Sequence, residues 1–271
     1  MNAPPVSLET LVQLDLDFAR AASGRTELIS RRTQYPWSLT QPFHDEAGTA
    51  TVIPQSASGG LYAGERVRQR IVVGEGAAVH VMSQGATVVH ACRDGPAPES
   101  HWCLEAGEGA HLAVLNDPVV LSPGAALDQV WDIVAAPGAR VLLIESWTWH
   151  PDPAAPAFER FCNTLNLRRP DGRLLARERS EATAAAVERL RAATMPPPAA
   201  FATAVVAGLG GEALTEALHK TVARVPDAWS GVSILPNAAG TVVRAACGNA
   251  GALRPWAQAV RCAVNGTDCG N

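Results

Sequence analysis

Strict alternation of apolar and polar residues is the feature that most limits how this chain can fold. The first clear case is residues 11–18, where apolar side chains occupy every second position: Val12, Leu14, Leu16 and Phe18. Successive side chains of a β-strand point to opposite faces, so this pattern is typical of a half-buried strand. Comparable segments follow, separated by Gly, Pro, Asp and Asn: residues 50–53, 65–73, 77–84, 111–115, 129–134, 140–149 and 160–167. The chain is therefore predicted to be mainly β.

A short sequence unit recurs along this β-rich part, with a spacing of about 30 residues. Each unit is a turn, a Gly-Ala pair and a strand: GEGAAVHVMS (74–83), GEGAHLAVLN (107–116) and APGARVLLIE (136–145). One such unit cannot bury its own apolar face, so repeated units must stack to form a common core. We therefore expect a stacked or helical β-sheet arrangement of many short strands.

The periodicity changes after about residue 180. Apolar residues at helical spacing predict α-helices over residues 181–194, 210–224 and 252–264, and three prolines end the first of them. Residues 200–208 and 242–247 are predicted strands. We expect two or three α-helices in the C-terminal third. We also expect one domain over 1–271, with a β-rich part (8–180), a mixed α/β part (181–265) and a short tail, because no stretch is long enough to be a linker.

Composition excludes several classes of protein. Apolar residues make up 47% of the chain, which is ample for a core. The formal net charge of −4 gives no reason to expect a nucleic-acid partner, and no apolar run is long enough to span a membrane. The first residues lack the basic start of a signal peptide, so we expect a cytoplasmic protein whose six cysteines are reduced.

The stretch SGGLYAGERV (58–67) contains glycines at the spacing of a phosphate-binding P-loop, since four residues separate Gly59 from Gly64. Glu65 stands where a P-loop has its lysine, so the charge has the wrong sign for phosphate. The following residues alternate as a strand, whereas a P-loop leads into a helix. The sequence therefore predicts a glycine-bearing connection between strands, without a nucleotide.

Two His-x-Cys units, HAC (90–92) and HWC (101–103), flank the loop 93–100. If they pair as antiparallel strands, His90 faces Cys103 and Cys92 faces His101. Two imidazoles and two thiols on one face suit zinc or nickel. The alternative is structural, because cysteine is a common small core residue and a strand histidine often serves as a polar neighbour.

No catalytic constellation stands out in the sequence. It contains neither a G-x-S-x-G elbow nor an H-E-x-x-H motif, so we expect no catalytic residues and no enzyme. Two other interpretations stay open: a hydrolase or isomerase that uses scattered His and carboxylate side chains, and a stand-alone metal-binding β protein that uses the His-x-Cys units.

Several motifs together resemble the urease accessory protein UreD family (also called UreH). Residues 23–43 resemble its opening, and residues 58–93 resemble its central signature, which places these family-motif residues: Gly59, Gly60, Gly64, Glu65, Gly85, Ala86 and Thr87. Residues 105–125 show a similar strand start. The chain resembles a diverged member, because Glu65 replaces the usual Asp, residues 90–93 replace a Tyr-Arg-Ser segment, and residues 149–161 lack a Gly-Arg-x-x-x-Gly-Glu segment.

The resemblance implies a non-enzymatic chaperone with one UreD-like domain, a helically stacked β fold and a few helices. It also implies three partners: the helical accessory protein UreF, the GTPase UreG and apo-urease. Such a scaffold helps to assemble the nickel metallocentre of urease. On this basis we expect no tightly bound cofactor and only a transient nickel ion.

Overall fold

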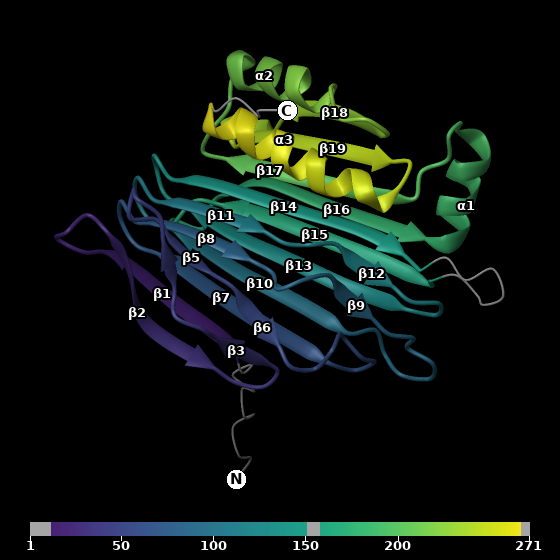
Figure 1. Cartoon of the computed structure of the whole chain (residues 1–271), viewed down its shortest axis with the longest axis horizontal. Coiled ribbons are helices and arrows are strands. Elements are labelled where there is room, and N and C mark those ends of the chain that lie inside the picture. The colour runs from purple at the N-terminus through teal and green to yellow at the C-terminus, as the bar shows by residue number, and fades with distance from the viewer. Residues whose placement is uncertain (1–11, 151–157, 267–271) are drawn as a thin grey trace, which may run out of the picture.

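Two facing β-sheets form the body of the protein, as the computed structural model shows (Figure 1). The structure describes residues 12–150 and 158–266. Residues 1–11, residues 151–157 of the diverged segment and residues 267–271 of the expected tail lie outside the described part. Strands dominate the described chain, so the prediction of a mainly β fold is confirmed.

The first sheet has seven strands, of which the middle five run parallel and the two outer ones antiparallel to their neighbours. Its order from edge to edge is β16 (Leu174–Thr183), β15 (Arg160–Arg168), β13 (Ala126–Ala135), β10 (Glu99–Ala106), β7 (Arg66–Val73), β1 (Leu14–Arg20) and β2 (Thr26–Thr33).

The second sheet has ten strands. Its main order is β18 (Ala228–Ile234), β19 (Gly240–Cys247), β17 (Ala200–Ala207), β14 (Arg140–Trp149), β11 (His111–Leu115), β8 (Ala78–Met82), β5 (Ala50–Val52) and β4 (Phe43–His44). Beside β14 lie β12 (Val119–Leu121) and then β9 (Thr87–Val89). A separate pair is formed by β3 (Trp37–Leu39) and β6 (Pro54–Ser56).

The sequence repeat corresponds to one coil of this stacked arrangement. The chain passes from β7 to β8, from β10 to β11 and from β13 to β14, and each step crosses from the first sheet to the second. The Gly-Ala pairs lie in these crossings, where Gly76, Gly109 and Gly138 have φ of 61°, 64° and 73°. Glycine adopts such positive φ without steric cost, so the repeat places glycine where the backbone needs it. The expected stacked β arrangement is confirmed.

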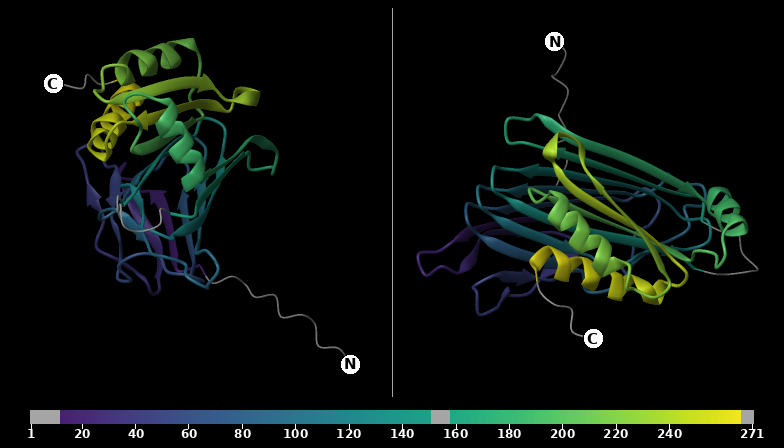
Figure 2. Two further views of the ribbon diagram at one scale, coloured as in Figure 1. Left: turned by 90° about the vertical axis from the view of Figure 1, so that its right-hand side faces the viewer. Right: turned by 90° about the horizontal axis from the view of Figure 1, so that it is seen from above.

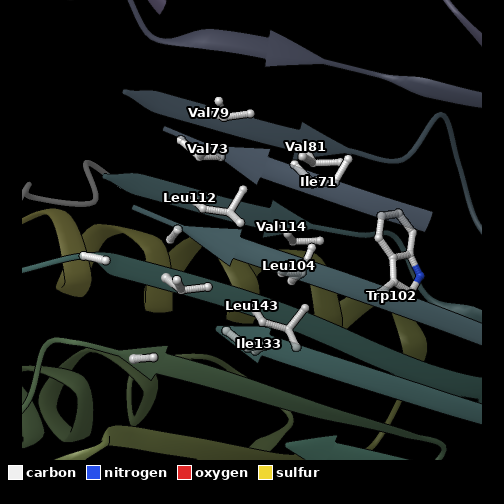
Figure 3. Packing of buried hydrophobic residues seen from close by; sticks show 14 of the residues in the cluster. Ile71, Val73, Val79, Val81, Trp102, Leu104, Leu112, Val114, Ile133 and Leu143 are labelled. Atoms are coloured by element: carbon white, nitrogen blue, oxygen red, sulfur yellow. The ribbon is translucent and has the colours of Figure 1, made fainter. Parts of the chain in front are cut away.

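The main core lies between the two sheets. Figure 3 shows its side chains: Ile71, Val73, Leu104 and Ile133 on the first sheet face Val79, Val81, Leu112, Val114 and Leu143 on the second. These residues occupy alternate positions of their strands, as the period of two predicts. Each fully buried side chain of this kind contributes about 1.5–3 kcal/mol to folding.

Helices cover only part of this body. α2 (Glu212–Val222) and α3 (Leu253–Asn265) pack together and against the C-terminal strands of the second sheet, burying Leu218 and Trp256 there, while α1 (Ala184–Ala193) lies at the end of the sheets (Figures 1 and 2). Two short 3-10 helices complete the list: η1 (Pro236–Ala238) and η2 (Ala250–Ala252). Within the described residues, no helix is long and apolar enough to cross a membrane.

The predicted helices all form, but one prediction was wrong at its start. Residues 181–183 continue strand β16, and α1 begins only at Ala184. The hydroxyl of Thr183 accepts a hydrogen bond from the backbone nitrogen of Ala186 at 3.2 Å and thereby caps the helix. That cap, and the pairing of Thr183 with Arg160 on β15, set the boundary. The single-domain interpretation stays a prediction.

Candidate functional site

The glycines of residues 58–64 let the chain approach strand β9 closely. Gly59, Gly60 and Gly64 have φ of 73°, 152° and 78°. The backbone nitrogen of Leu61 donates to the carbonyl oxygen of Val88 at 2.8 Å, in the approach that Gly60 makes possible. A Cβ atom on Gly60 would lie only 2.4 Å from that same oxygen, so no other residue fits there.

Glu65 closes the turn that follows these glycines. Its carboxylate accepts a hydrogen bond from the backbone nitrogen of Tyr62 at 2.9 Å, and its own nitrogen donates to the carbonyl oxygen of Tyr62 at 3.1 Å. The next element is strand β7, beginning at Arg66. The prediction of a glycine-bearing connection before a strand is therefore confirmed, and the acid has a structural role in the turn.

A pocket of about 390 Å³ lies between the two sheets, and five of the seven family-motif residues line it. Gly59 and Gly60 line it from one loop, while Gly85, Ala86 and Thr87 line it from the loop that enters β9. The strands β7, β10 and β13 supply the other side of its lining. The two parts of the signature thus lie at one place in the fold, although the chain separates them.

The inner face of the first sheet becomes polar beside this pocket. Four buried polar side chains occur there: Gln69, Ser100, Gln129 and Asn163. The parallel register places Ser100 next to Gln129, and Gln129 next to Asn163. Gln69, Ser100 and Gln129 line the pocket. We call these four residues the polar row.

Glu145 on β14 faces the polar row from the second sheet. Its carboxylate accepts hydrogen bonds from Gln129 Nε2 at 2.9 Å, Trp131 Nε1 at 2.8 Å and Asn163 Nδ2. Glu145 lies deep in the protein, although part of its surface stays accessible to solvent. Burial raises the pKa of Glu145 to about 7, against the lowering effect of the three donors. This carboxyl group can therefore gain or lose its proton near neutral pH.

Asn163 adds an unused acceptor to this group. Its Oδ1 is buried and has no hydrogen-bond partner among the described residues. A buried acceptor without a partner is uncommon, because leaving it unsatisfied costs free energy. Glu145 and the polar row were not predicted from the sequence. Their signal is a charged or amide side chain at an inward position of an otherwise apolar strand, as in RVLLIESW.

The predicted antiparallel pairing of the two His-x-Cys units is wrong. Strand β10, which contains His101 and Cys103, has two neighbours, β7 and β13, and both run parallel to it. Residues 90–92 follow β9, which belongs to the other sheet. The loop 93–98 therefore carries the chain from one sheet to the other and does not form a hairpin.

His90 and Cys92 have separate structural surroundings. The ring of His90 stacks on Tyr62 with centroids 4.3 Å apart. Cys92 is buried, where its Sγ donates to the carbonyl oxygen of Ala126 at 3.7 Å and accepts from the nitrogen of Ala126 at 3.3 Å. The four predicted ligands are thus not brought together.

His101 and Cys103 do share one face of β10, and the structure adds a carboxylate to them. Asp132 on β13 lies opposite Cys103 in the register, and its Oδ2 is 2.6 Å from His101 Nε2. Cys103 Sγ is 3.7 Å from the same Nε2. Burial, together with the nearby carboxylates, raises the pKa of Cys103. Asp132 was not predicted from the sequence, where its only signal is its outward position in QVWDIV.

This trio does not have the geometry of a Cys-His-Asp catalytic triad. A triad needs the acid on one ring nitrogen of histidine and the nucleophile on the other. Here Asp132 and Cys103 both approach Nε2 of His101, while Arg68 Nη1 occupies Nδ1 at 2.9 Å. The raised pKa of Cys103 also disfavours the thiolate that would act as a nucleophile.

Comparison with known proteins agrees with the motifs described above. The model of the family described as UreD urease accessory protein matches residues 12–270. The chain is 39% identical to urease accessory protein UreD 1 of Methylorubrum extorquens (strain PA1), over 95% of this chain and 88% of that protein. It is 34% identical to UreD 1 of Pseudomonas syringae pv. tomato, over 88% and 85%.

A third relative has a different number in its name. The chain is 31% identical to urease accessory protein UreD 2 of a Bradyrhizobium species (strain BTAi1), over 95% of this chain and 91% of that protein. All three relatives are named as accessory proteins, which is consistent with a role other than catalysis. The matched family model covers nearly the whole sequence, and the chain belongs to the UreD urease accessory protein family.

Proposed function

We propose that the chain is a scaffold for urease maturation. It binds a helical accessory protein of the UreF type, which recruits a GTPase of the UreG type, and the assembly delivers nickel to apo-urease in the cytoplasm. Membership of the UreD family supports this function. The chain itself holds no cofactor tightly, and nickel is its cargo.

The observation that carries the proposal is Glu145 beside the polar row. A carboxylate and an amide group are neighbours there: Asn163 Nδ2 bonds the Glu145 carboxylate, and the buried Oδ1 of Asn163 has no hydrogen-bond partner in the part of the chain that the structure describes. Oxygen ligands bind nickel less strongly than thiolates or several imidazoles do. A set of weak ligands suits an ion that must enter and leave. Gln129 bonds Glu145 and also lines the pocket, so it connects the carboxylate to the pocket.

The protonation of Glu145 supports a transient role. A carboxyl group whose pKa is about 7 is neutral in a good part of the molecules at neutral pH. The empty site then avoids the cost of an uncompensated buried charge. An arriving cation displaces the proton and binds the carboxylate, and the proton returns when the cation leaves.

The test is activation of urease in cells that express apo-urease, the other accessory proteins and this chain with nickel in the medium. Omitting the chain is expected to abolish activation, and equal activation without it would overturn the proposed function. Glu145→Gln is expected to reduce activation, with Glu108→Gln as the matched control on an exposed turn. If only the role of Glu145 is wrong, the chain stays essential and Glu145→Gln activates fully.

Partner binding provides an independent test. A tagged chain is expected to capture the helical accessory protein, and through it the GTPase, from cells that express all three. Capture should persist in Glu145→Gln, because Glu145 lies inside the protein. Failure of the unmodified chain to capture either protein would contradict the scaffold role.

A further inference from the structure

The outer face of the first sheet gathers three side chains that bind metals in other proteins. Within the described residues, one group of three or more His, Cys, Asp or Glu side chains lies close enough together to hold a metal ion: His101, Cys103 and Asp132. Their ligand atoms lie within 4.8 Å of one another. The side chains of His101 and Asp132 are 25% and 36% exposed, so an ion can reach them from solvent.

We propose that His101 Nε2, Cys103 Sγ and Asp132 Oδ2 bind a divalent transition-metal ion of borderline softness, such as Zn²⁺, Co²⁺ or Ni²⁺. An imidazole, a thiolate and a carboxylate form a mixed ligand set that suits these ions. Three protein ligands leave a fourth position for water, so the ion stays exchangeable. The site does not rest on the proposed function, because it involves neither Glu145 nor a partner.

The spacing of the ligand atoms fits such an ion after a small movement. Ligands of a tetrahedral zinc ion lie roughly 3.5 Å apart, given Zn–N of about 2.0 Å and Zn–S of about 2.3 Å. Cys103 Sγ and His101 Nε2 are already 3.7 Å apart. The separation of 2.6 Å between His101 Nε2 and Asp132 Oδ2 must widen by less than about 1 Å, which a change in the χ angles of Asp132 supplies.

The neighbouring residues hold the ligands in place. Asn166 Nδ2 donates to Asp132 Oδ1 at 2.8 Å, which orients the carboxylate and leaves its other oxygen for the ion. Arg70 lies beside Cys103 in the register, but its guanidinium is paired with three carboxylates: Asp15, Asp17 and Glu105. Most of its charge is therefore balanced within that network and does not oppose a cation.

Arg68 is the group that competes with the ion. Its Nη1 lies 2.9 Å from His101 Nδ1, and because arginine only donates hydrogen bonds, Nδ1 must accept. The neutral imidazole then carries its proton on Nε2 and donates it to Asp132. When a metal ion binds Nε2, that proton moves to Nδ1, the thiol proton of Cys103 goes to solvent, and Arg68 must turn away.

Little holds Arg68 in its present position. Its Nε is buried and has no hydrogen-bond partner among the described residues. A buried donor without a partner costs free energy, so turning the guanidinium toward solvent removes one unfavourable feature. We infer that Arg68 acts as a removable competitor, and that its replacement by a neutral side chain tightens metal binding.

Cobalt titration of the purified, reduced, metal-free full chain tests the site. Thiolate ligation gives Co²⁺ a charge-transfer absorption band in the near ultraviolet. We expect this band to saturate at one Co²⁺ ion per chain, and to disappear when Zn²⁺ or Ni²⁺ displaces the cobalt. Cys103→Ser, His101→Gln and Asp132→Asn are each expected to weaken binding by about 10- to 100-fold, and Cys103→Ser to abolish the band. Cys162→Ser is the matched control, since Cys162 pairs with Asp128 in the register of the neighbouring strand, away from the trio.

Arg68→Gln gives a result that misfolding cannot imitate, because it is expected to tighten Co²⁺ binding several-fold. Arg66→Gln is its control: Arg66 is exposed and paired with Glu99. A chain without a charge-transfer band overturns the proposal. So does a Cys103→Ser variant that keeps both the band and the affinity, or an Arg68→Gln variant that binds no more tightly than Arg66→Gln. These measurements use the isolated chain, so their failure leaves the urease role standing.

Discussion

The carboxylate of Glu65 accepts a hydrogen bond from the backbone nitrogen of Tyr62 at 2.9 Å, across the turn that precedes β7. Residues 58–67 have the glycine spacing of a P-loop, but Glu65 stands at the position of the P-loop lysine. The bond gives this acid a structural role, because its carboxylate accepts the hydrogen bond of a backbone N–H in its own turn. The family motif that residues 58–93 resemble is expected to have Asp at this place. The longer side chain of Glu65 still makes a turn hydrogen bond here.

Removing this carboxylate is expected to destabilise the turn. Glu65→Ala leaves the Tyr62 nitrogen without its charged acceptor, and we expect the free energy of unfolding to fall by about 1 kcal/mol. Urea denaturation followed by circular dichroism measures the change. Glu75→Ala is the control, since Glu75 is exposed in a turn that begins another strand. Equal stability of the two variants would contradict the role of Glu65.

Gly60 is expected to tolerate no side chain. In Gly60→Ala the new Cβ would lie 2.4 Å from the carbonyl oxygen of Val88, at a φ of 152° that side chains rarely adopt. We expect the free energy of unfolding to fall by about 1–3 kcal/mol, as measured by urea denaturation. Gly85→Ala in the second half of the signature is the control, because nothing lies within 4 Å of its added Cβ. A small effect at both positions would show that the contact with Val88 relaxes easily.

The sequence predicted the strands that bury apolar side chains on one face or on both. β7 buries Val67, Ile71 and Val73 at alternate positions, and β11 and β14 have the predicted bounds. The edge strands were missed because their pattern differs. β2, β16 and β18 are exposed at half or more of their positions, so they show no regular apolar alternation, and each pairs with one neighbouring strand.

The candidate sites show a different limit of sequence reasoning. The two His-x-Cys units are close in the chain, so a local hairpin was the natural interpretation, yet the coil places them in different sheets. Asp132 reaches His101 through parallel pairing between successive coils. Such pairing joins residues about one repeat apart, and its register is fixed by the whole stack. The repeat predicted the coil, but it did not predict which side chains meet.

The stability of the protein is expected to fall with rising pH because of Glu145. Its pKa is about 7 in the folded protein and 4.5 without the protein environment. Between these values the unfolded chain releases the proton while the folded protein keeps it, so the free energy of unfolding decreases, and above about pH 7 it changes no further. The loss is about 1–3 kcal/mol, since part of Glu145 remains accessible to solvent.

Glu145→Gln isolates this contribution. Its stability relative to the unmodified protein should rise across the interval from pH 4.5 to about 7 and then level off, as measured by urea denaturation at a series of pH values. Glu108→Gln should run parallel to the unmodified protein, because Glu108 is exposed. A Glu145→Gln curve that also runs parallel would mean that the pKa of Glu145 is not raised.

His80 and His111 are expected to make the protein sensitive to acid. Their rings lie edge to face with centroids 6.2 Å apart, on adjacent strands of the second sheet. Burial lowers the pKa of both below 6.5, and for His80 the positive charges of His111 and Arg261 lower it further, while Asp45 acts in the opposite direction. Because their pKa values are lowered, the two histidines are protonated at a lower pH in the folded protein than in the unfolded chain. Their neutral forms therefore contribute fully to the free energy of unfolding above about pH 6.5, and this contribution is lost as the pH falls through and below that value.

His80→Gln tests this sensitivity because it replaces one titrating ring with a neutral polar side chain. It removes the proton uptake of His80 and the repulsion that a protonated His80 exerts on His111. We expect the variant to lose less stability than the unmodified protein between about pH 7 and pH 5, as followed by thermal unfolding at each pH. His219→Gln is the matched control, since His219 is exposed near the end of α2. If the acid-induced loss is the same in all three proteins, the histidine pair does not control it, and the carboxylate network around Arg70, whose acids pair with a cation in the folded state, becomes the group to substitute next.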